Sequence, residues 1–248
     1  MSKYLLRKNF TGFIKNSDEI IRGKVAFKTK TTCWLETENP VIILVSVHSA
    51  FHDEIDGDLK MSALLSIIKN HVKGDITVLF ADQAHLKVTS LHYHDDTETA
   101  SSNCLNTAEA LYQRYHTHLE GCKIVYWHSY ICQDRGFIAA LKIMQNFYHT
   151  DSIFRALIHQ DAEATYNPER MKYFPNKSLF IERAIDDLLG QCAAEWVLSQ
   201  KGYRFQFYSG SSYASIGYTN CKFISEKERI SWIDVFLAIE KKSRARLC

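Results

Sequence analysis

Proline and glycine, the residues that most often mark domain boundaries, are scarce in this sequence. Three prolines and ten glycines occur among 248 residues, and neither a low-complexity linker nor an internal repeat divides the chain. The sequence therefore predicts a single domain over residues 1–248. This length suits one α/β domain, which can reach about 250 residues.

Long apolar segments are absent as well. No run approaches the roughly 20 apolar residues of a membrane span. The opening residues, MSKYLLRKNF, lack the apolar region of a signal peptide. We therefore expect a soluble, cytoplasmic protein that has no membrane partner.

The cysteines show no pairing pattern. All seven lie outside any Cys-x-x-Cys pair, and their odd number and wide spacing argue against a disulfide framework or a structural zinc site. The densest group of possible metal ligands is His92, His94, Asp95 and Asp96, in a polar stretch that is typical of a loop. We expect neither a metal ion nor a cofactor.

Several motifs of well-known enzyme classes are also missing. The sequence has no Gly-x-Gly-x-x-Gly, no P-loop and no Gly-x-Ser-x-Gly, which argues against dinucleotide binding, P-loop chemistry and an α/β-hydrolase. The net charge of +2 is too small to indicate a nucleic-acid partner by itself. Such a partner must be argued from local groups of basic residues.

What the sequence does contain is an alternation of buried strands and helices. Apolar, β-branched runs at residues 40–47, 75–81 and 122–130 are typical of strands buried on both faces. Helical patterns at residues 61–72 and 107–119 separate them. This order predicts an α/β fold in which helices cover the faces of a parallel sheet.

The remaining segments extend the pattern. A closing helix is predicted at residues 225–242, because Ile230, Ile233, Phe236 and Leu237 recur at helical spacing, and a basic tail follows to residue 248. The other predicted segments are an N-terminal arm or edge strand at 1–38, one long or two short helices at 135–165, a helix at 177–199 and a strand at 203–208.

Ligands of a parallel sheet bind at the carboxyl ends of its strands. Residues 46–54, 82–85, 128–130 and 208–212 are therefore the candidate site. Ser46 ends the first core strand, and a serine there can act as a nucleophile if a neighbouring group takes its proton. Serines at strand ends more often bond to the backbone or cap the next helix, so the position alone leaves both roles open.

The wider pattern resembles the tRNA-dependent cyclodipeptide synthases. VIILVSVHSAFHDE, an amphipathic helix and ITVLFADQAHL resemble the family's first two core strands, and IVYWHSY and GYRFQFYSG resemble two later ones. The match looks closest to the subfamily with a Ser-Val-x-x-x-x-His-Glu motif and a final Tyr-Pro, where this chain has Tyr208 and Ser209. The resemblance covers roughly residues 40–215.

This resemblance implies a fold and a reaction. The fold is a Rossmann-like domain similar to the catalytic domain of class I aminoacyl-tRNA synthetases. The serine that matches Ser46 takes an aminoacyl group from aminoacyl-tRNA, a second aminoacyl-tRNA then yields a dipeptidyl enzyme, and cyclisation releases a diketopiperazine. Ser49, Asp82 and Tyr208 stand where substrate contacts are expected.

The chain departs from the family on the helix before the last core strand. The family uses a tyrosine and, four residues later, a glutamate, and the best match places Asp187 and Gln191 at these catalytic positions. If Gln191 replaces the acid, the charge that orients the amino group is lost, which implies slow, altered or absent synthesis. A register one turn earlier gives Glu182 and Asp186, and either pair is also compatible with exposed helix positions.

Three functions therefore remain open. A cyclodipeptide synthase that uses aminoacyl-tRNA is favoured over a degraded family member that binds tRNA or another adenosine-bearing ligand without turnover, and over an unrelated α/β enzyme. The densest basic cluster, KKSRAR at residues 241–246, is either a tRNA contact or a solvated helix end. The oligomeric state stays open, with a monomer slightly favoured.

Overall fold

The computed structural model describes residues 4–13, 19–29, 33–47, 56–167, 176–209 and 212–243. One mixed sheet runs through this part of the chain, with the strand order β1-β2-β7-β6-β3-β4-β5. The strands are β1 (Tyr4–Phe13), β2 (Glu19–Thr29), β3 (Val41–Ser46), β4 (Ile76–Ala81), β5 (Lys123–Tyr126), β6 (Phe205–Tyr208) and β7 (Ser231–Ser243).

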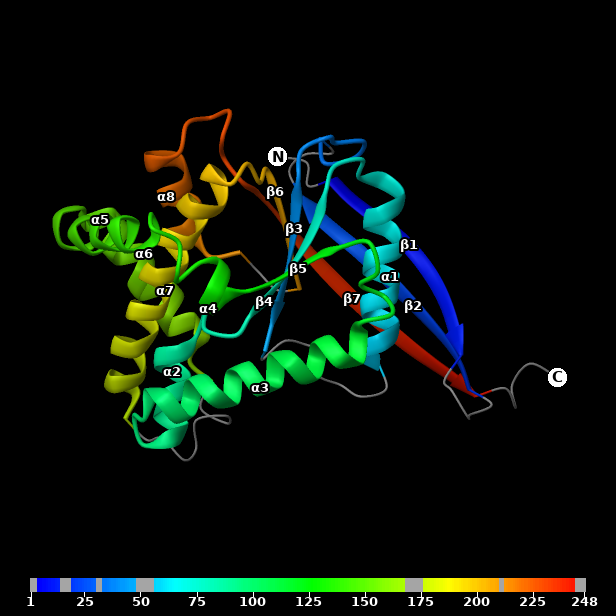
Figure 1. Cartoon of the computed structure of the whole chain (residues 1–248), viewed down its shortest axis with the longest axis horizontal. Coiled ribbons are helices and arrows are strands. Elements are labelled where there is room, and N and C mark those ends of the chain that lie inside the picture. Colours follow the sequence, from blue (N-terminus) through cyan, green and yellow to red (C-terminus); the bar gives the residue numbers. More distant parts are fainter. Residues whose placement is uncertain are drawn as a thin grey trace.

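The centre of the sheet is parallel, as the strand–helix alternation predicts. β7, β6, β3, β4 and β5 are parallel neighbours, whereas β1 and β2 join antiparallel at the β7 side. The N-terminal segment thus supplies the edge strand β1 and its neighbour β2. Together with β7 these strands form the long ribbon at the right of Figure 1.

The predicted closing helix at residues 225–242 is wrong, because residues 231–243 form β7. The beginning of β7 pairs with β6, and Asp234–Ser243 pairs with β2. Ile233 and Val235 are buried at alternate positions, which is the period of a strand. Both partner strands lie outside the segment itself, so the local spacing of apolar residues could not reveal the pairing. Pairing with other strands overrides the local preference of a segment for helix or strand.

Helices cover both faces of the sheet (Figure 1). One face packs against α1 and α3 around Val41, Ile43 and Phe80, and the other packs against the remaining helices around Ile42, Leu44 and Leu79. The helices are α1 (Asp56–His71), α2 (Leu86–Ser90), α3 (Thr97–Tyr115), α4 (Trp127–Tyr130), α5 (Phe137–Thr150), α6 (Ser152–Thr165), α7 (Lys177–Gln200) and α8 (Ala214–Phe223), with a 3-10 turn at Leu91–Tyr93.

Two predicted boundaries need correction. The stretch 92–103, predicted as a loop, turns helical at Thr97 because Asp96 accepts hydrogen bonds from the backbone N–H groups of Glu98 and Thr99. An aspartate at this position caps a helix. The third core strand ends at Tyr126, and the following residues form the short helix α4.

The order of the strands fixes where a ligand can bind. From β3 the chain moves to β4 and β5, and it then returns through α7 to β6 on the other side of β3. The connections therefore diverge between β3 and β6, and such a switch point opens a crevice at the carboxyl ends of the strands. Ser46 ends β3 and Tyr208 ends β6, so both residues lie at this crevice.

Candidate active site

Ser46 lies on the face of the sheet that packs against α7. It pairs with Ala81 of β4, and the side chains of Ile42 and Leu44, at alternate positions before it, belong to the core on the α7 side. Only 5% of Ser46 is exposed. The hydroxyl is therefore held at the end of a rigid strand in a largely dry environment.

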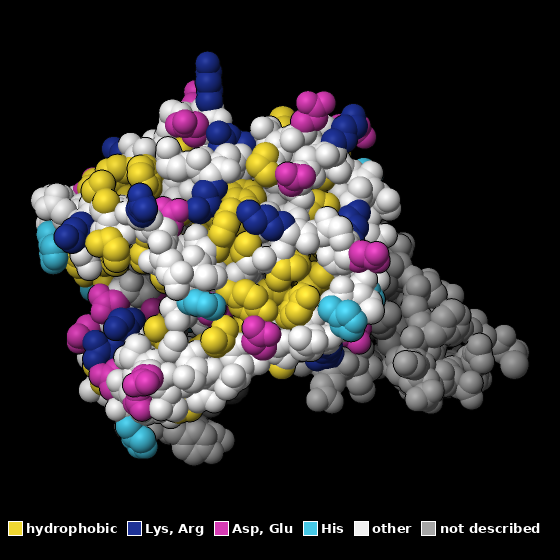
Figure 2. Space-filling view, viewed as in Figure 1, with side chains coloured by type: hydrophobic (Ala, Val, Ile, Leu, Met, Phe, Trp, Pro, Cys, Tyr) yellow, Lys and Arg dark blue, Asp and Glu magenta, His cyan; other side chains and the backbone are white. Residues whose placement is uncertain are grey.

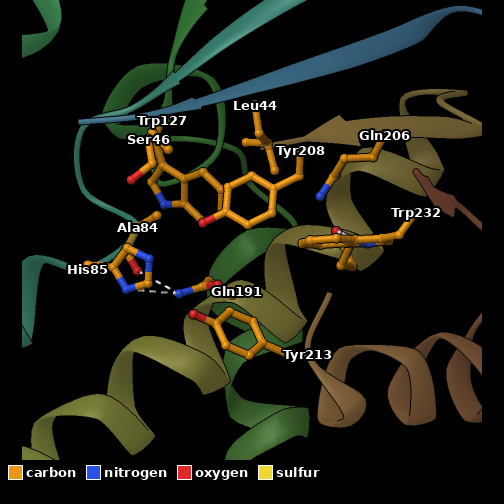
Figure 3. A pocket seen from close by; sticks show the side chains of 12 residues that line it. Leu44, Ser46, Ala84, His85, Trp127, Gln191, Gln206, Tyr208, Tyr213 and Trp232 are labelled. Atoms are coloured by element: carbon orange, nitrogen blue, oxygen red, sulfur yellow. Dashed lines mark hydrogen bonds between the residues drawn. The ribbon is translucent and has the colours of Figure 1, made fainter. Parts of the chain in front are cut away.

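Two adjoining pockets meet at Ser46. The inner pocket has a volume of about 30 Å³, and the outer pocket has a volume of about 260 Å³. Both are lined by Ser46, His85, Tyr208 and Tyr213. Figure 3 shows these four side chains around the inner pocket, with Trp127 and Trp232 completing its wall.

The structure brings together three of the site residues predicted from the sequence. Ser46 and Tyr208 line both pockets, and Gln191 lines the inner one. Ser49 lies outside the described residues, as do His48 and His52. His85, which lies in the candidate range 82–85, is the imidazole that shares both pockets with Ser46.

Asp82 does not line either pocket. Its carboxylate is almost fully buried and accepts hydrogen bonds from the Nδ1 atom of His128, at 2.6 Å, and from the backbone N–H of the same residue, at 3.2 Å. These bonds tie the end of β4 to α4. A contact between Asp82 and the substrate stays a prediction, whereas its contact with His128 is structural.

The side chain of Asp187 forms hydrogen bonds with the backbone of a neighbouring helix. Its two carboxylate oxygens each accept a hydrogen bond, from the backbone N–H groups of Lys87 and Val88, both at 2.9 Å. These groups belong to the first turn of α2, where N–H groups lack partners within the helix. Burial raises the pKa of Asp187 to about 7, against the opposing effect of these two donors.

Gln191 lies one turn later on the same face of α7. Its Nε2 atom donates to the carbonyl oxygen of Ala84 at 3.0 Å and lies 3.4 Å from the Nδ1 atom of His85. Asp187 and Gln191 are thus buried, and not the exposed positions that the alternative interpretation of this helix allowed. The other register is less suited to a site, since the Glu182 side chain is 68% exposed and neither Glu182 nor Asp186 lines a pocket.

Two polar residues of the inner pocket were missed by the sequence analysis. Glu195, one turn beyond Gln191 on α7, is 3% exposed, and Gln206, in the middle of β6, is 0% exposed. The Oε1 atom of Glu195 accepts a hydrogen bond from the indole Nε1 of Trp232 at 3.1 Å. Burial raises the pKa of Glu195 to about 8, and the indole and the nearby Gln206 amide act in the opposite direction.

Both missed residues leave a signal in the sequence. Glu195 interrupts the otherwise apolar run Cys192–Leu198, and Gln206 stands between Phe205 and Phe207, which are both buried. A charged or amide side chain within a buried element is costly unless it is paired, so it marks a functional candidate. Residues 203–208 were predicted as a strand, and Gln206 was not assigned to either of its faces.

The site places a serine hydroxyl beside an imidazole, two tyrosines and a buried carboxyl group. The twelve residues that line the inner pocket include no lysine or arginine.

Among the described residues, no group of three or more metal-ligating side chains occurs. None of the helices in the described part of the chain combines the length and apolar character that a membrane crossing requires.

The fold of the chain is that of solved cyclodipeptide synthases. A synthase from Fluoribacter dumoffii matches with a TM-score of 0.74 at 18% identity, covering 89% of this chain and 99% of that chain. One from Candidatus Glomeribacter gigasporarum, bound to Phe-tRNAPhe, matches with a TM-score of 0.61 at 16% identity, covering 79% and 86%. No protein-family model and no curated protein sequence matches the chain.

A third structure links this fold to a broader class. A Mycobacterium tuberculosis protein, described as showing that cyclodipeptide synthetases are related to type I tRNA synthetases, matches with a TM-score of 0.57 at 10% identity. The match covers 86% of this chain and 93% of that chain. The fold predicted from the sequence, an α/β domain with a Rossmann-like parallel core and helices on both faces, is confirmed.

Proposed function

We propose that the protein is a tRNA-dependent cyclodipeptide synthase in which Ser46 carries the aminoacyl group. The observation that carries this proposal is the position of Ser46. It ends the strand at the switch point of a cyclodipeptide-synthase fold, and it lines both of the adjoining pockets. Two pockets at one nucleophile suit a reaction that joins two aminoacyl groups.

The proposed reaction has three steps. The Oγ atom of Ser46 bonds to the carbonyl carbon of an aminoacyl-tRNA ester, the bond to the ribose oxygen breaks, and the serine proton ends on that oxygen. The amino group of the acyl-enzyme then attacks the carbonyl carbon of a second aminoacyl-tRNA ester, so a peptide bond forms, the bond to the ribose oxygen breaks, and a proton of the amine ends on that oxygen as the second tRNA leaves. The terminal amine of the dipeptide finally attacks the ester at Ser46, closing the ring and returning the proton to Oγ.

The neighbouring residues support these steps. The small inner pocket suits the side chain of the group held on Ser46, while the larger outer pocket suits the incoming residue. His85 lines both pockets together with Ser46, which supports His85 as the group that exchanges a proton with the serine. Gln191 donates to Ala84 and lies against His85, so it orients the loop that carries the imidazole.

An aminoacyl-tRNA partner is supported by a structural neighbour and not by a single basic surface. The Candidatus Glomeribacter gigasporarum synthase is solved with Phe-tRNAPhe. On the face of this molecule shown in Figure 2, Lys and Arg side chains are scattered among acidic ones. Residues 241–243 of the basic tail form the end of β7, and residues 244–246 lie outside the described residues, so the role of the tail as a tRNA contact stays a prediction.

A second function is favoured by one observation. Asp187 and Gln191, which match the family's tyrosine and glutamate, are both engaged with backbone groups of this chain. If these bonds persist when substrate is present, neither side chain can bind the amino group of the aminoacyl substrate. The chain would then bind aminoacyl-tRNA without forming dipeptides.

Labelling of the protein by aminoacyl-tRNA tests the proposed function. Wild-type protein mixed with tRNA that carries radiolabelled amino acids should retain the label on a peptide that contains Ser46, and Ser46→Ala should remove it. Ser129→Ala is the matched control, because Ser129 lies at the same edge of the sheet and outside both pockets. Equal labelling of the wild-type protein and of Ser46→Ala would refute the assignment.

A further inference from the structure

The floor of the inner pocket carries polar atoms that have no partner. Within the described residues, the Oε2 atom of Glu195 and both the Oε1 and Nε2 atoms of Gln206 are buried without a hydrogen bond of regular geometry, although the Gln206 amide lies close enough to the Glu195 carboxyl to lower its pKa. Figure 3 shows the Gln206 side chain projecting from its strand into the pocket beside Tyr208 and Trp232. Buried polar groups are almost always paired, so three unpaired atoms at one pocket floor call for a ligand that pairs them.

The walls around this floor are apolar and aromatic. Leu44, Ala81, Trp127 and Trp232 line the same pocket. A ligand group that enters this pocket is therefore removed from water. Its hydrogen-bond partners must then be the polar atoms of Glu195 and Gln206. A site built to hydrogen-bond a substrate discriminates strongly against an analogue that lacks the bonding group, because the protein's own groups are then left unpaired.

The unpaired atoms define the chemistry of the ligand group. The amide of Gln206 offers one donor and one acceptor, and the Oε2 atom of Glu195 lies near it. An ammonium group can only donate, which leaves the Nε2 atom of Gln206 unpaired. A carboxylate can only accept, which leaves the Oε1 atom of Gln206 unpaired. A hydroxyl or a carboxamide both donates and accepts hydrogen bonds, so it can pair both the Oε1 and the Nε2 atom of Gln206.

The size of the pocket sets the length of that group. The volume of about 30 Å³ corresponds to roughly two water positions at about 10–15 Å³ each. This admits a short side chain and excludes a long one. No lysine or arginine among the lining residues supplies a counter-charge for Glu195, and burial raises the pKa of its carboxyl, which favours the neutral form.

We propose that the inner pocket selects, as the first aminoacyl group, a residue whose short neutral side chain both donates and accepts hydrogen bonds: serine, threonine or asparagine. This inference rests on the proposed function, since it assigns the side chain of the group that Ser46 carries. Gln206 and Glu195 are the residues that determine the specificity.

The experiment compares amino acids of nearly equal shape on one tRNA. A single tRNA is charged in turn with threonine or valine, and with asparagine, leucine or diaminobutyrate, and the rate of Ser46 acylation is measured in a single turnover. Threonine should react faster than valine, and asparagine faster than leucine, by about 10- to 100-fold, the effect of leaving buried groups unpaired. Diaminobutyrate, which is cationic, should react more slowly than asparagine.

Two variants locate the effect. Gln206→Leu should bring both ratios close to one or invert them, because the amide is replaced by an apolar side chain. Gln83→Leu is the matched control and should keep the wild-type ratios, because Gln83 bonds to Ser101 and lines neither pocket. The ratios in the wild-type protein decide the question even if Gln206→Leu does not fold.

Each outcome is decisive. Faster acylation by valine and leucine would overturn the inference and leave the proposed function standing. Faster acylation by diaminobutyrate would also overturn it, because Glu195 would then act as a carboxylate counter-ion. The absence of acylation with all five amino acids would overturn the inference, and labelling of Ser46 by tRNA that carries the full set of amino acids would then decide the proposed function separately.

Discussion

Replacing Glu195 by glutamine should make the stability of the protein less dependent on pH. In the folded protein, burial raises the pKa of this carboxyl from 4.5 to about 8. Between these values the folded state keeps the proton and the unfolded state releases it. The free energy of unfolding of the wild-type protein therefore falls as the pH rises through this window, by about 1.4 kcal/mol per pH unit for this one group.

The magnitude follows from the width of that window. A difference of roughly three pH units corresponds to a loss on the order of 4 kcal/mol between pH 5 and pH 8. Glutamine has the shape of the protonated acid and keeps the oxygen that accepts from Trp232 at 3.1 Å. Glu195→Gln should therefore match the wild-type protein near pH 5 and be several kcal/mol more stable near pH 8.

Urea unfolding at constant ionic strength, at four pH values from 5 to 8, measures this difference. Asp187, whose pKa is also raised, contributes a slope of the same sign to both proteins and cancels in the comparison. Parallel curves for wild type and variant would refute the reasoning. They would show that Glu195 is ionised in the folded protein at neutral pH.

The remaining predictions concern the supports of the site. Asp187→Ala leaves two buried N–H groups of α2 unpaired, so the free energy of unfolding should fall by about 1–3 kcal/mol for each. Asp186→Ala is the matched control and should have a much smaller effect, because Asp186 is exposed and makes neither of these bonds. Gly74→Ala should destabilise the protein by about 1–3 kcal/mol, because a Cβ atom there would lie 2.3 Å from the carbonyl oxygen of Asn39. Urea unfolding measures both.

The centre of the fold could be predicted because its signals are local. β3 and β4 are apolar, β-branched runs of the length expected for buried strands, and α7 is a long helical pattern between a capping Asn176 and Gly202. The positive φ angle of Gly202, 91°, suits a glycine at a helix end. For these segments the preference of the chain and the demands of packing agree.

The periphery could not be predicted in the same way. β7 was expected to be a helix, since its apolar residues fit helical spacing as well as alternation, and its partners β2 and β6 are distant in sequence. The first turns of α3 were hidden in a polar run whose cap, Asp96, was not recognised. In both cases the deciding interaction lies outside the periodicity of apolar residues.

The site was predictable in position and only partly in content. Ser46 and Tyr208 could be placed because strand ends of a parallel sheet meet at one edge. Glu195 and Gln206 could not be placed, since their inward orientation depends on which face of α7 and β6 meets the pocket. That choice follows from packing across elements and not from the local sequence.

Formation of a diketopiperazine tests the central claim most directly. The protein is expressed in bacteria, which supply every aminoacyl-tRNA, and the medium is analysed by mass spectrometry against a culture that expresses Ser46→Ala. The account predicts at least one diketopiperazine that appears with the wild-type protein and is absent with Ser46→Ala. Identical media from the two cultures, with both proteins folded and abundant, would contradict it.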